Sequence, residues 1–166
     1  MDKKRKKYTK VNIGIYEKDV FAEYGYDNHE LIEESLVYTV YSLAETKPIK
    51  ENLELSFTKK VDAEFDENRF KTAYKNTITS KIKSLNLELR RCFLIGLLLL
   101  LAGVSVLCVD VFLIGDVSEF LYEFINIMAW VFCWAGIEVM TIHAVQIIIE
   151  KRKYKRLLNC KISFKN

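Results

Sequence analysis

The residues best able to do chemistry lie in a long apolar stretch in the second half of the chain. Glu138 follows Trp130 and Trp134 at two successive spacings of four, which places all three on one face of a helix. A carboxylate among apolar residues must be paired, protonated or in contact with water, and an ionisable group inside a membrane marks a candidate functional site. Three roles are open for Glu138: a structural ion pair, movement of protons or ions, and contact between subunits.

Two arginines that precede the first apolar run, Arg90 and Arg91, are the expected partners of this carboxylate. At about 1.5 Å of rise per residue, Glu138 lies about 26 Å along a helix from Leu121, close to the membrane surface at which the arginines would enter. A guanidinium on a long side chain can reach inward to a carboxylate. We therefore expect an ion pair between Glu138 and Arg90 or Arg91 that fastens two helices together.

The two tryptophans are expected to pack against the neighbouring helix. Trp130 and Trp134 would fill the seam with the first apolar helix, where Gly96 and Gly103 let two backbones approach closely. A cage for a cation would need aromatic rings that converge from several directions. One stripe of rings on one helix does not supply them.

The other polar groups predict no catalytic or metal centre. His143 has only His29 as a second histidine, and no two of the four cysteines have the two-residue spacing of a zinc or redox motif. The sequence contains neither a glycine-rich phosphate loop nor a nucleophile elbow. We therefore expect no enzymatic activity, no metal and no cofactor.

The elements that would hold these residues are two apolar runs, which predict a transmembrane helical hairpin over residues 92–149. The spans are expected at about 92–114 and 121–143, each long enough to cross about 30 Å of hydrocarbon. Basic residues precede the first run and follow the second, whereas the turn at 115–119 carries only acidic charge. This distribution predicts that both chain ends are cytoplasmic, with the hairpin in the cell (inner) membrane.

A basic run follows the second span and is expected to contact the headgroups of anionic lipids. Its members are Lys151, Arg152, Lys153, Lys155 and Arg156. Aromatic residues are not interleaved with the basic ones, as a groove for single-stranded nucleic acid would require. The lipid bilayer is therefore the expected partner, and no nucleic acid is expected.

Residues 11–91 predict a small cytoplasmic domain with the order β-α-β-α. Apolar residues alternate with polar ones at 11–15 and again at 53–57, which indicates two strands. A helix between them makes a crossover connection, for which parallel strands are expected. Residues 1–10 are expected to form a basic tail, and residues 150–166 a basic helix end and a closing strand that joins the sheet.

The two helices of this domain have recognisable start signals. Asp27 or Asn28 can cap the first, which is expected to run to about Ala44 with acidic residues in its first turns. Asp66 can cap the second, which continues without a break toward the first span. The expected fold class is therefore an α+β membrane protein, with a small cytoplasmic domain and a two-helix transmembrane hairpin.

The pattern Trp-Val-x-x-Trp-x-x-x-Glu at 130–138 resembles one in a group of small bacterial proteins with two transmembrane spans and a cytoplasmic α/β domain. The paired arginine before the first span and the basic segment that ends at 156–162 resemble the same group. The resemblance implies the hairpin topology and a role for Glu138. The group has no established activity, so the resemblance implies no function.

The sequence thus predicts a non-enzymatic integral membrane protein, oligomeric, in which a hairpin anchors a cytoplasmic sensing or docking domain. A pore-forming effector or channel is one alternative, and a subunit of a larger membrane complex is another. A pore requires polar residues that share one lumen-facing stripe, but Asn126, Thr141 and Gln146 do not line up well on an ideal helix. The sequence identifies no soluble ligand.

Overall fold

The computed structural model describes residues 8–15, 20–22, 29–48, 52–59, 66–112 and 118–165. The chain forms two compact units: unit 1 is residues 1–84 with 150–166, and unit 2 is residues 85–149. The elements in chain order are β1 (Tyr8–Ile15), α1 (Glu34–Glu45), β2 (Asn52–Lys59), α2 (Glu67–Phe112), α3 (Glu119–Glu138), the π-helix η1 (Val139–His143), α4 (Ala144–Leu158) and β3 (Lys161–Lys165).

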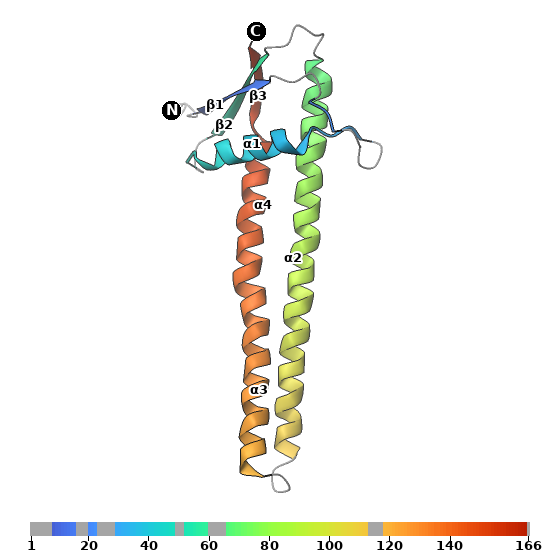
Figure 1. Ribbon diagram of the computed structural model, residues 1–166, viewed down its shortest axis with the longest axis vertical. Coiled ribbons are helices and arrows are strands. Elements are labelled where there is room, and N and C mark those ends of the chain that lie inside the picture. The colour runs from blue at the N-terminus through green and yellow to red at the C-terminus, as the bar shows by residue number, and fades with distance from the viewer. Residues whose placement is uncertain are drawn as a thin grey trace, which may run out of the picture. The chain divides into compact units, whose positions relative to one another are not determined.

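Unit 1 is built on a three-stranded parallel sheet in the order β1-β2-β3 (Figure 1). β1 pairs with β2 from Tyr8↔Asn52 onward, and β3 pairs with the other side of β2 from Glu54↔Lys161 onward. The predicted parallel pair and the predicted closing strand are both confirmed. The first strand begins at Tyr8, so residues 8–10 of the predicted tail belong to the sheet; residues 1–7 lie outside the described part of the chain.

The core of unit 1 lies on the face of the sheet that carries the alternating apolar residues. Three aromatic rings meet there: the centroids of Phe57 and Phe70 are 5.0 Å apart, and Phe164 of β3 lies 5.8 Å and 5.7 Å from them. The same cluster includes the following apolar residues of β1, α1, β2 and α2: Val11, Ile13, Ile15, Val37, Val40, Leu53, Leu55, Tyr74 and Ile78. The period of two in the strands and of about four in α2 therefore converge on one core.

The start of α2 is fixed by the predicted cap. Oδ1 of Asp66 accepts hydrogen bonds from the backbone N–H groups of Asn68 at 2.8 Å and Arg69 at 3.1 Å. These bonds satisfy two donors that have no partner inside the helix. The helix then continues without a break to Phe112, as the sequence predicted.

The first helix begins later than predicted, at Glu34. Ile32 forms an antiparallel bridge with Phe21, and its N–H donates to Oγ1 of Thr77 at 2.9 Å. Its side chain is buried, so the segment before α1 is held extended by pairing and packing. Of the acidic residues predicted for the first turns of this helix, only Glu34 lies in the first turn of α1. The predicted caps, Asp27 and Asn28, lie outside the described residues.

In unit 2 the end of α2 runs antiparallel to α3 at very short distance (Figure 1). A Cβ atom added to Gly96 would lie 2.9 Å from the carbonyl oxygen of Gly136, and one added to Gly103 would lie 2.9 Å from that of Ala129. Gly96 and Gly103 are seven residues apart, as are Ala129 and Gly136. Small residues thus return to the seam at every second turn and allow the two backbones to touch.

Candidate functional site

The candidate site is the surface of unit 2 that carries Glu138, and its position is set by the seam on the opposite side of α3. A Cβ atom at Gly103 would lie 2.5 Å from the thiol sulfur of Cys133, and one at Gly96 would lie 2.3 Å from Cγ of Met140. The other side of the seam is therefore formed by Ala129, Cys133 and Gly136 of α3 and by Met140 of η1. Gly96 and Gly103 lie where the sequence placed them, whereas these four residues were missed.

The π-helix η1 changes which residues face the seam after Glu138. A regular helix would return His143 to the seam seven residues after Gly136. One wider turn, Val139–His143, adds a residue, so that His143 is exposed and Ala144 is buried in its place. The hydroxyl of Thr141 donates to the carbonyl oxygen of Ile137 at 2.7 Å within the same stretch. Such π turns are frequent at functional sites.

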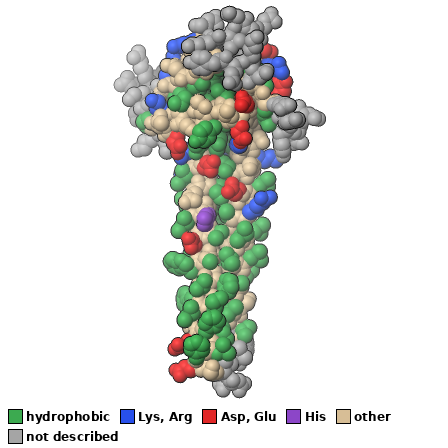
Figure 2. Space-filling view, viewed as in Figure 1, with side chains coloured by type: hydrophobic (Ala, Val, Ile, Leu, Met, Phe, Trp, Pro, Cys, Tyr) green, Lys and Arg blue, Asp and Glu red, His purple; other side chains and the backbone are tan. Residues whose placement is uncertain are grey.

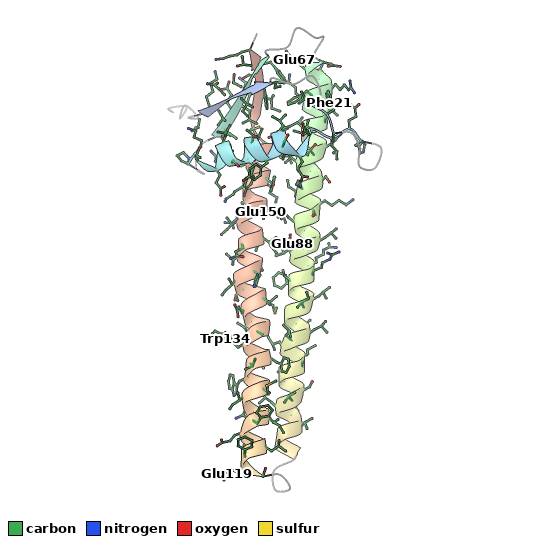
Figure 3. The ribbon with its side chains drawn as sticks, viewed as in Figure 1. Phe21, Glu67, Glu88, Glu119, Trp134 and Glu150 are labelled. Carbon is green, nitrogen blue, oxygen red and sulfur yellow. The ribbon has the colours of Figure 1, made fainter. Side chains whose placement is uncertain are left out.

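The two tryptophans lie on the outside of the hairpin, so the prediction that they fill its seam is wrong. Trp130 is 65% exposed and Trp134 is 70% exposed, and Figure 3 shows Trp134 on the side of α3 away from α2. The indoles are too large for a seam in which backbones touch. The residues that pack there are small or, like Met140, flexible.

The predicted latch between Glu138 and Arg90 or Arg91 is not formed. All three side chains are exposed, and none of them makes an ion pair within the described residues of unit 2. Glu138 lies on the outer side of α3, about opposite Gly136, which explains why it faces away from the arginines of its own chain. An exposed carboxylate therefore stands on a helix face that is otherwise apolar.

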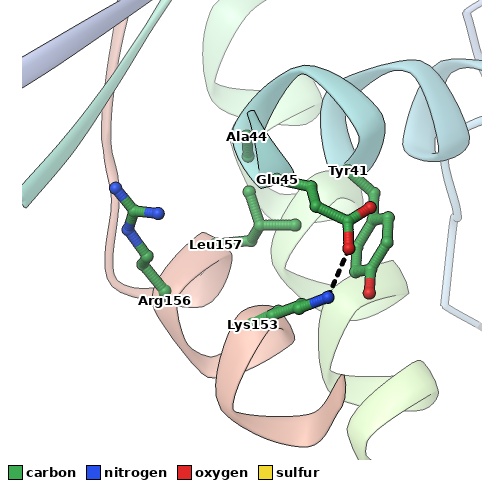
Figure 4. A pocket seen from close by; sticks show the side chains of 6 residues that line it. All are labelled: Tyr41, Ala44, Glu45, Lys153, Arg156 and Leu157. Atoms are coloured by element: carbon green, nitrogen blue, oxygen red, sulfur yellow. Dashed lines mark hydrogen bonds and ion pairs between the residues drawn. The ribbon is translucent and has the colours of Figure 1, made fainter. Parts of the chain in front are cut away.

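Two side chains of the basic run of α4 make contacts inside unit 1. Lys153 pairs with Glu45 of α1, as Figure 4 shows. Its Nζ lies 5.8 Å from the ring centroid of Tyr41. Arg156 donates to the carbonyl oxygens of Lys47 at 3.3 Å and Pro48 at 2.8 Å. These two side chains therefore fasten α4 to the end of α1, and their predicted contact with headgroups stays a prediction.

The rest of the basic run is still placed for contact with anionic groups. Arg152 and Lys155 are exposed and Lys151 is half-buried. The hydrogen bond with Glu45 raises the pKa of Lys153, so that this cation is held in its charged form by a neighbour on α1. The lipid-contact prediction also remains for Lys151, Arg152 and Lys155.

A small cavity lies at this joint between α1 and α4 (Figure 4). Its volume is about 40 Å³, which is room for a few water molecules and well below the size of pockets that hold small ligands. The ring of Tyr41 stacks on Tyr154 beside it with centroids 4.9 Å apart. The arrangement is that of a packed joint. Its lining residues are Tyr41, Ala44, Glu45, Lys153, Arg156 and Leu157.

A larger cavity of about 360 Å³ lies beside α1 and α2 in unit 1. Its charged groups, Glu34 and Lys81, pair with each other. The hydroxyl of Thr77 accepts from the N–H of Ile32 and donates to the carbonyl oxygen of Ala73 at 2.8 Å. These polar groups are thus already bonded within the protein. The cavity is lined by Ala22, Leu31, Ile32, Glu34, Val37, Thr77, Ser80, Lys81 and Ser84.

The buried hydroxyl of Tyr74 and the half-buried thiol of Cys160 lie at the edge of the core of unit 1, at the end of α4. The hydroxyl of Tyr74 lies 3.3 Å from the carbonyl oxygen of Leu157, to which it donates, and 3.9 Å from the sulfur of Cys160. Burial raises the pKa of Tyr74 well above its usual range and raises the pKa of Cys160 to about 11. A thiol with so high a pKa is a poor nucleophile at neutral pH.

Among the residues that the structure describes, no group of three or more His, Cys, Asp or Glu side chains is placed to hold a metal ion. The chain matches no protein-family model, and no curated protein or solved structure is significantly similar to it.

Proposed function

We propose that the protein is a non-enzymatic integral membrane protein in which a two-helix hairpin anchors an α/β unit that senses or docks a partner. The observation that carries this proposal is the exposure of the apolar helices. Two helices are long and apolar enough to cross a membrane, yet only 11% of the most apolar window of the first and 17% of that of the second are buried. A core helix of a soluble protein would be mostly buried.

The exposed surface is too apolar to favour contact with water. Figure 2 shows apolar side chains over much of the visible surface of α2 and α3. Exposed side chains there include Leu94, Leu97, Leu98, Leu101, Phe124, Ile127, Val131 and Ile137. Water-soluble monomers rarely expose apolar patches larger than about 600 Å². Lipid chains would remove the cost of hydrating these groups, at about 25 cal/mol per Å².

The distribution of charge supports an orientation with both chain ends in the cytoplasm. Arg90 and Arg91 stand before the apolar part of α2, and the basic run of α4 follows the apolar part of the second helix. The other end of the hairpin carries Glu119 and Glu123. The whole stretch from residue 92 to residue 150 contains no Lys or Arg. Positive charge on the same side of both helices favours retention of that side in the cytoplasm.

A docking role for unit 1 is supported by the form of its sheet. β1 and β3 are edge strands, and edge strands can pair with an extended segment of a partner. The face opposite the core carries polar side chains, including the pair formed by Lys10 and Glu54 at 3.6 Å. The hydroxyl of Ser56 on that side is buried and has no hydrogen-bond partner within the described structure.

Membrane anchoring can be tested by two matched arginine substitutions on α2, Leu98→Arg and Leu87→Arg. Both leucines are exposed, at 66% and 50%, so neither change should unfold a water-soluble chain. If α2 spans the membrane, arginine at 98 should reduce insertion, because its cost near the centre of a span is about 2.5–3.5 kcal/mol. We expect wild type and Leu87→Arg to stay in the membrane pellet after alkaline carbonate extraction and Leu98→Arg to be partly extracted. Release of wild type and Leu87→Arg from the membrane pellet to the same extent as Leu98→Arg would overturn membrane anchoring.

The docking role is tested separately in native membranes with a photo-crosslinking residue. At Lys161 on β3, which is exposed, it should capture a polypeptide partner. At Lys75, which is exposed on α2 in the same unit, it should capture much less. Equal capture at both positions, or none at Lys161, would contradict docking at this edge of the sheet.

A further inference from the structure

We propose that the outer face of α3 binds a second copy of this chain, and that Glu138 of one copy pairs with Arg90 or Arg91 of the next. The inference rests on the proposed membrane insertion. It names the partner that covers Glu138 and gives this carboxylate a role between subunits. The interface would be the same pair of surfaces repeated from copy to copy.

The outer face of α3 has the spacing of a helix-packing seam. Six residues follow one another at intervals of four, three, four, three and four on the side opposite the glycine seam: Phe120, Phe124, Ile127, Val131, Trp134 and Glu138. The five apolar members are between 53% and 80% exposed. This is the seven-residue repeat with which two helices pack side by side. α3 therefore carries two seams, of which its own chain fills one.

Charge complementarity identifies the occupant as a second copy. Of the three carboxylates in residues 119–138, only Glu138 lies in this repeat, and α2 presents the exposed Arg90 and Arg91. Each chain thus offers a carboxylate on one helix and guanidinium groups on the other that do not pair within it. Ionic groups on a membrane-embedded surface are costly unless they are paired. A neighbouring copy supplies the missing charge to both faces.

Glu138 and Arg91 lie close enough in level along the hairpin to pair between two copies. Gly96 lies against Gly136 and Met140, so Glu138 stands at the level of Gly96. Arg91 is five residues from Gly96, which is about 7.5 Å along the helix. A long arginine side chain can extend over much of that distance. All copies insert with the same orientation, so α3 of one copy meets α2 of the next antiparallel and at this same level.

The pairing of two different faces has a consequence for the assembly. An interface in which the α3 face of one copy binds the α2 face of the next is head-to-tail. Head-to-tail contacts close into a ring when the rotation between copies allows it. The structure thus favours a cyclic oligomer over a two-fold dimer in which two Glu138 side chains would meet.

The test measures the mass of the purified full-length protein in dodecyl maltoside micelles by native mass spectrometry over a range of concentrations. Wild type should be oligomeric. Glu138→Gln should weaken association on the order of 30-fold or more, because it leaves a buried arginine unpaired. Glu123→Gln is the matched control, since Glu123 is exposed on the same helix but lies outside the repeat. It should leave the oligomer unchanged.

Charge exchange makes the test specific. Glu138→Arg should give monomers, and combination with either Arg90→Glu or Arg91→Glu should restore the oligomer and identify the partner arginine. If Glu138→Arg does not fold, Arg90→Gln and Arg91→Gln replace it, and at least one should weaken association as Glu138→Gln does. A wild type that is monomeric throughout, or oligomers that none of these changes weaken, would overturn the inference. Carbonate extraction of the same membranes shows separately whether membrane anchoring has failed.

Discussion

The contact between α2 and α3 at Gly136 offers a sharp test of the hairpin. A Cβ atom added there would lie 2.7 Å from the carbonyl oxygen of Gly96 and 3.0 Å from the backbone nitrogen of Leu100. Both are backbone atoms of the opposite helix and cannot turn away. Gly136→Ala should therefore force the two helices apart.

The magnitude follows from two opposed effects. Insertion of a methyl group into a packed contact costs about 1–3 kcal/mol. Replacement of glycine by alanine inside a helix returns up to about 1 kcal/mol. We expect Gly136→Ala to lower the free energy of unfolding by about 1–2 kcal/mol, which is a factor of about 5–30 in the unfolding equilibrium. Gly96→Ala should be destabilising too, because its added Cβ would lie 2.9 Å from the carbonyl oxygen of Gly136 as well as 2.3 Å from the flexible side chain of Met140.

The thiol of Cys133 provides the assay. It packs against Gly103 in the seam and is half-buried, so it should react with a maleimide faster when the hairpin opens. Labelling of the Cys133 peptide in detergent micelles, followed by mass spectrometry during a temperature ramp, reports opening of this contact. The control is Ala102→Val on the exposed side of α2, for which a change within about 0.5 kcal/mol is expected. A Gly136→Ala protein as stable as wild type, or more stable, would refute the seam.

Three further predictions concern unit 1. Asp66→Ala should lower the free energy of unfolding by about 1 kcal/mol through loss of the α2 cap, whereas Asp66→Asn should keep most of it; thermal unfolding followed by circular dichroism measures both. Cys160, whose pKa burial raises to about 11, should react with iodoacetamide at pH 8 on the order of a hundredfold more slowly than a cysteine in a short peptide. The rate is measured by peptide mass spectrometry, and a rate similar to that of the cysteine in the short peptide would contradict this prediction. The hydrogen bond from Arg69 lowers the pKa of Glu30 in the folded protein. The pair therefore stabilises the fold above the pKa of the unfolded carboxyl, and this stabilisation is lost as pH falls through the lower pKa of the folded state. Arg69→Gln should reduce the fall of the melting temperature below about pH 4.5, and an unchanged pH profile would contradict the pairing.

Periodicity predicted unit 1 well because its helices and strands have one apolar and one polar face. The core includes Phe70, Tyr74 and Ile78, which recur at intervals of four along α2, and Asp66 caps the helix that carries them. The late start of α1 escaped prediction because Ile32 fits a helical spacing while its backbone is held in a bridge to Phe21. Local pattern cannot reveal a partner that competes from elsewhere in the chain.

Periodicity failed in the hairpin because every face of α3 is apolar. Trp130 and Trp134 fit a packing stripe as well as any other residues do, yet both are exposed. The informative signal was size: Ala129 and Gly136 repeat at seven residues, as do Gly96 and Gly103 on α2. The pair of Lys153 with Glu45 was missed for another reason, since the two residues are 108 positions apart and either could have been a surface charge.

The central claim, that two helices cross a membrane and leave both chain ends on one side, is tested most directly by thiol labelling in intact inverted and right-side-out vesicles. Ser118→Cys at the start of α3 and Lys155→Cys on α4 are both at exposed positions, and each is placed in a chain whose four cysteines are replaced by alanine. A membrane-impermeant maleimide should label position 118 only in right-side-out vesicles and position 155 only in inverted ones. Labelling of both positions from the same side would contradict the account.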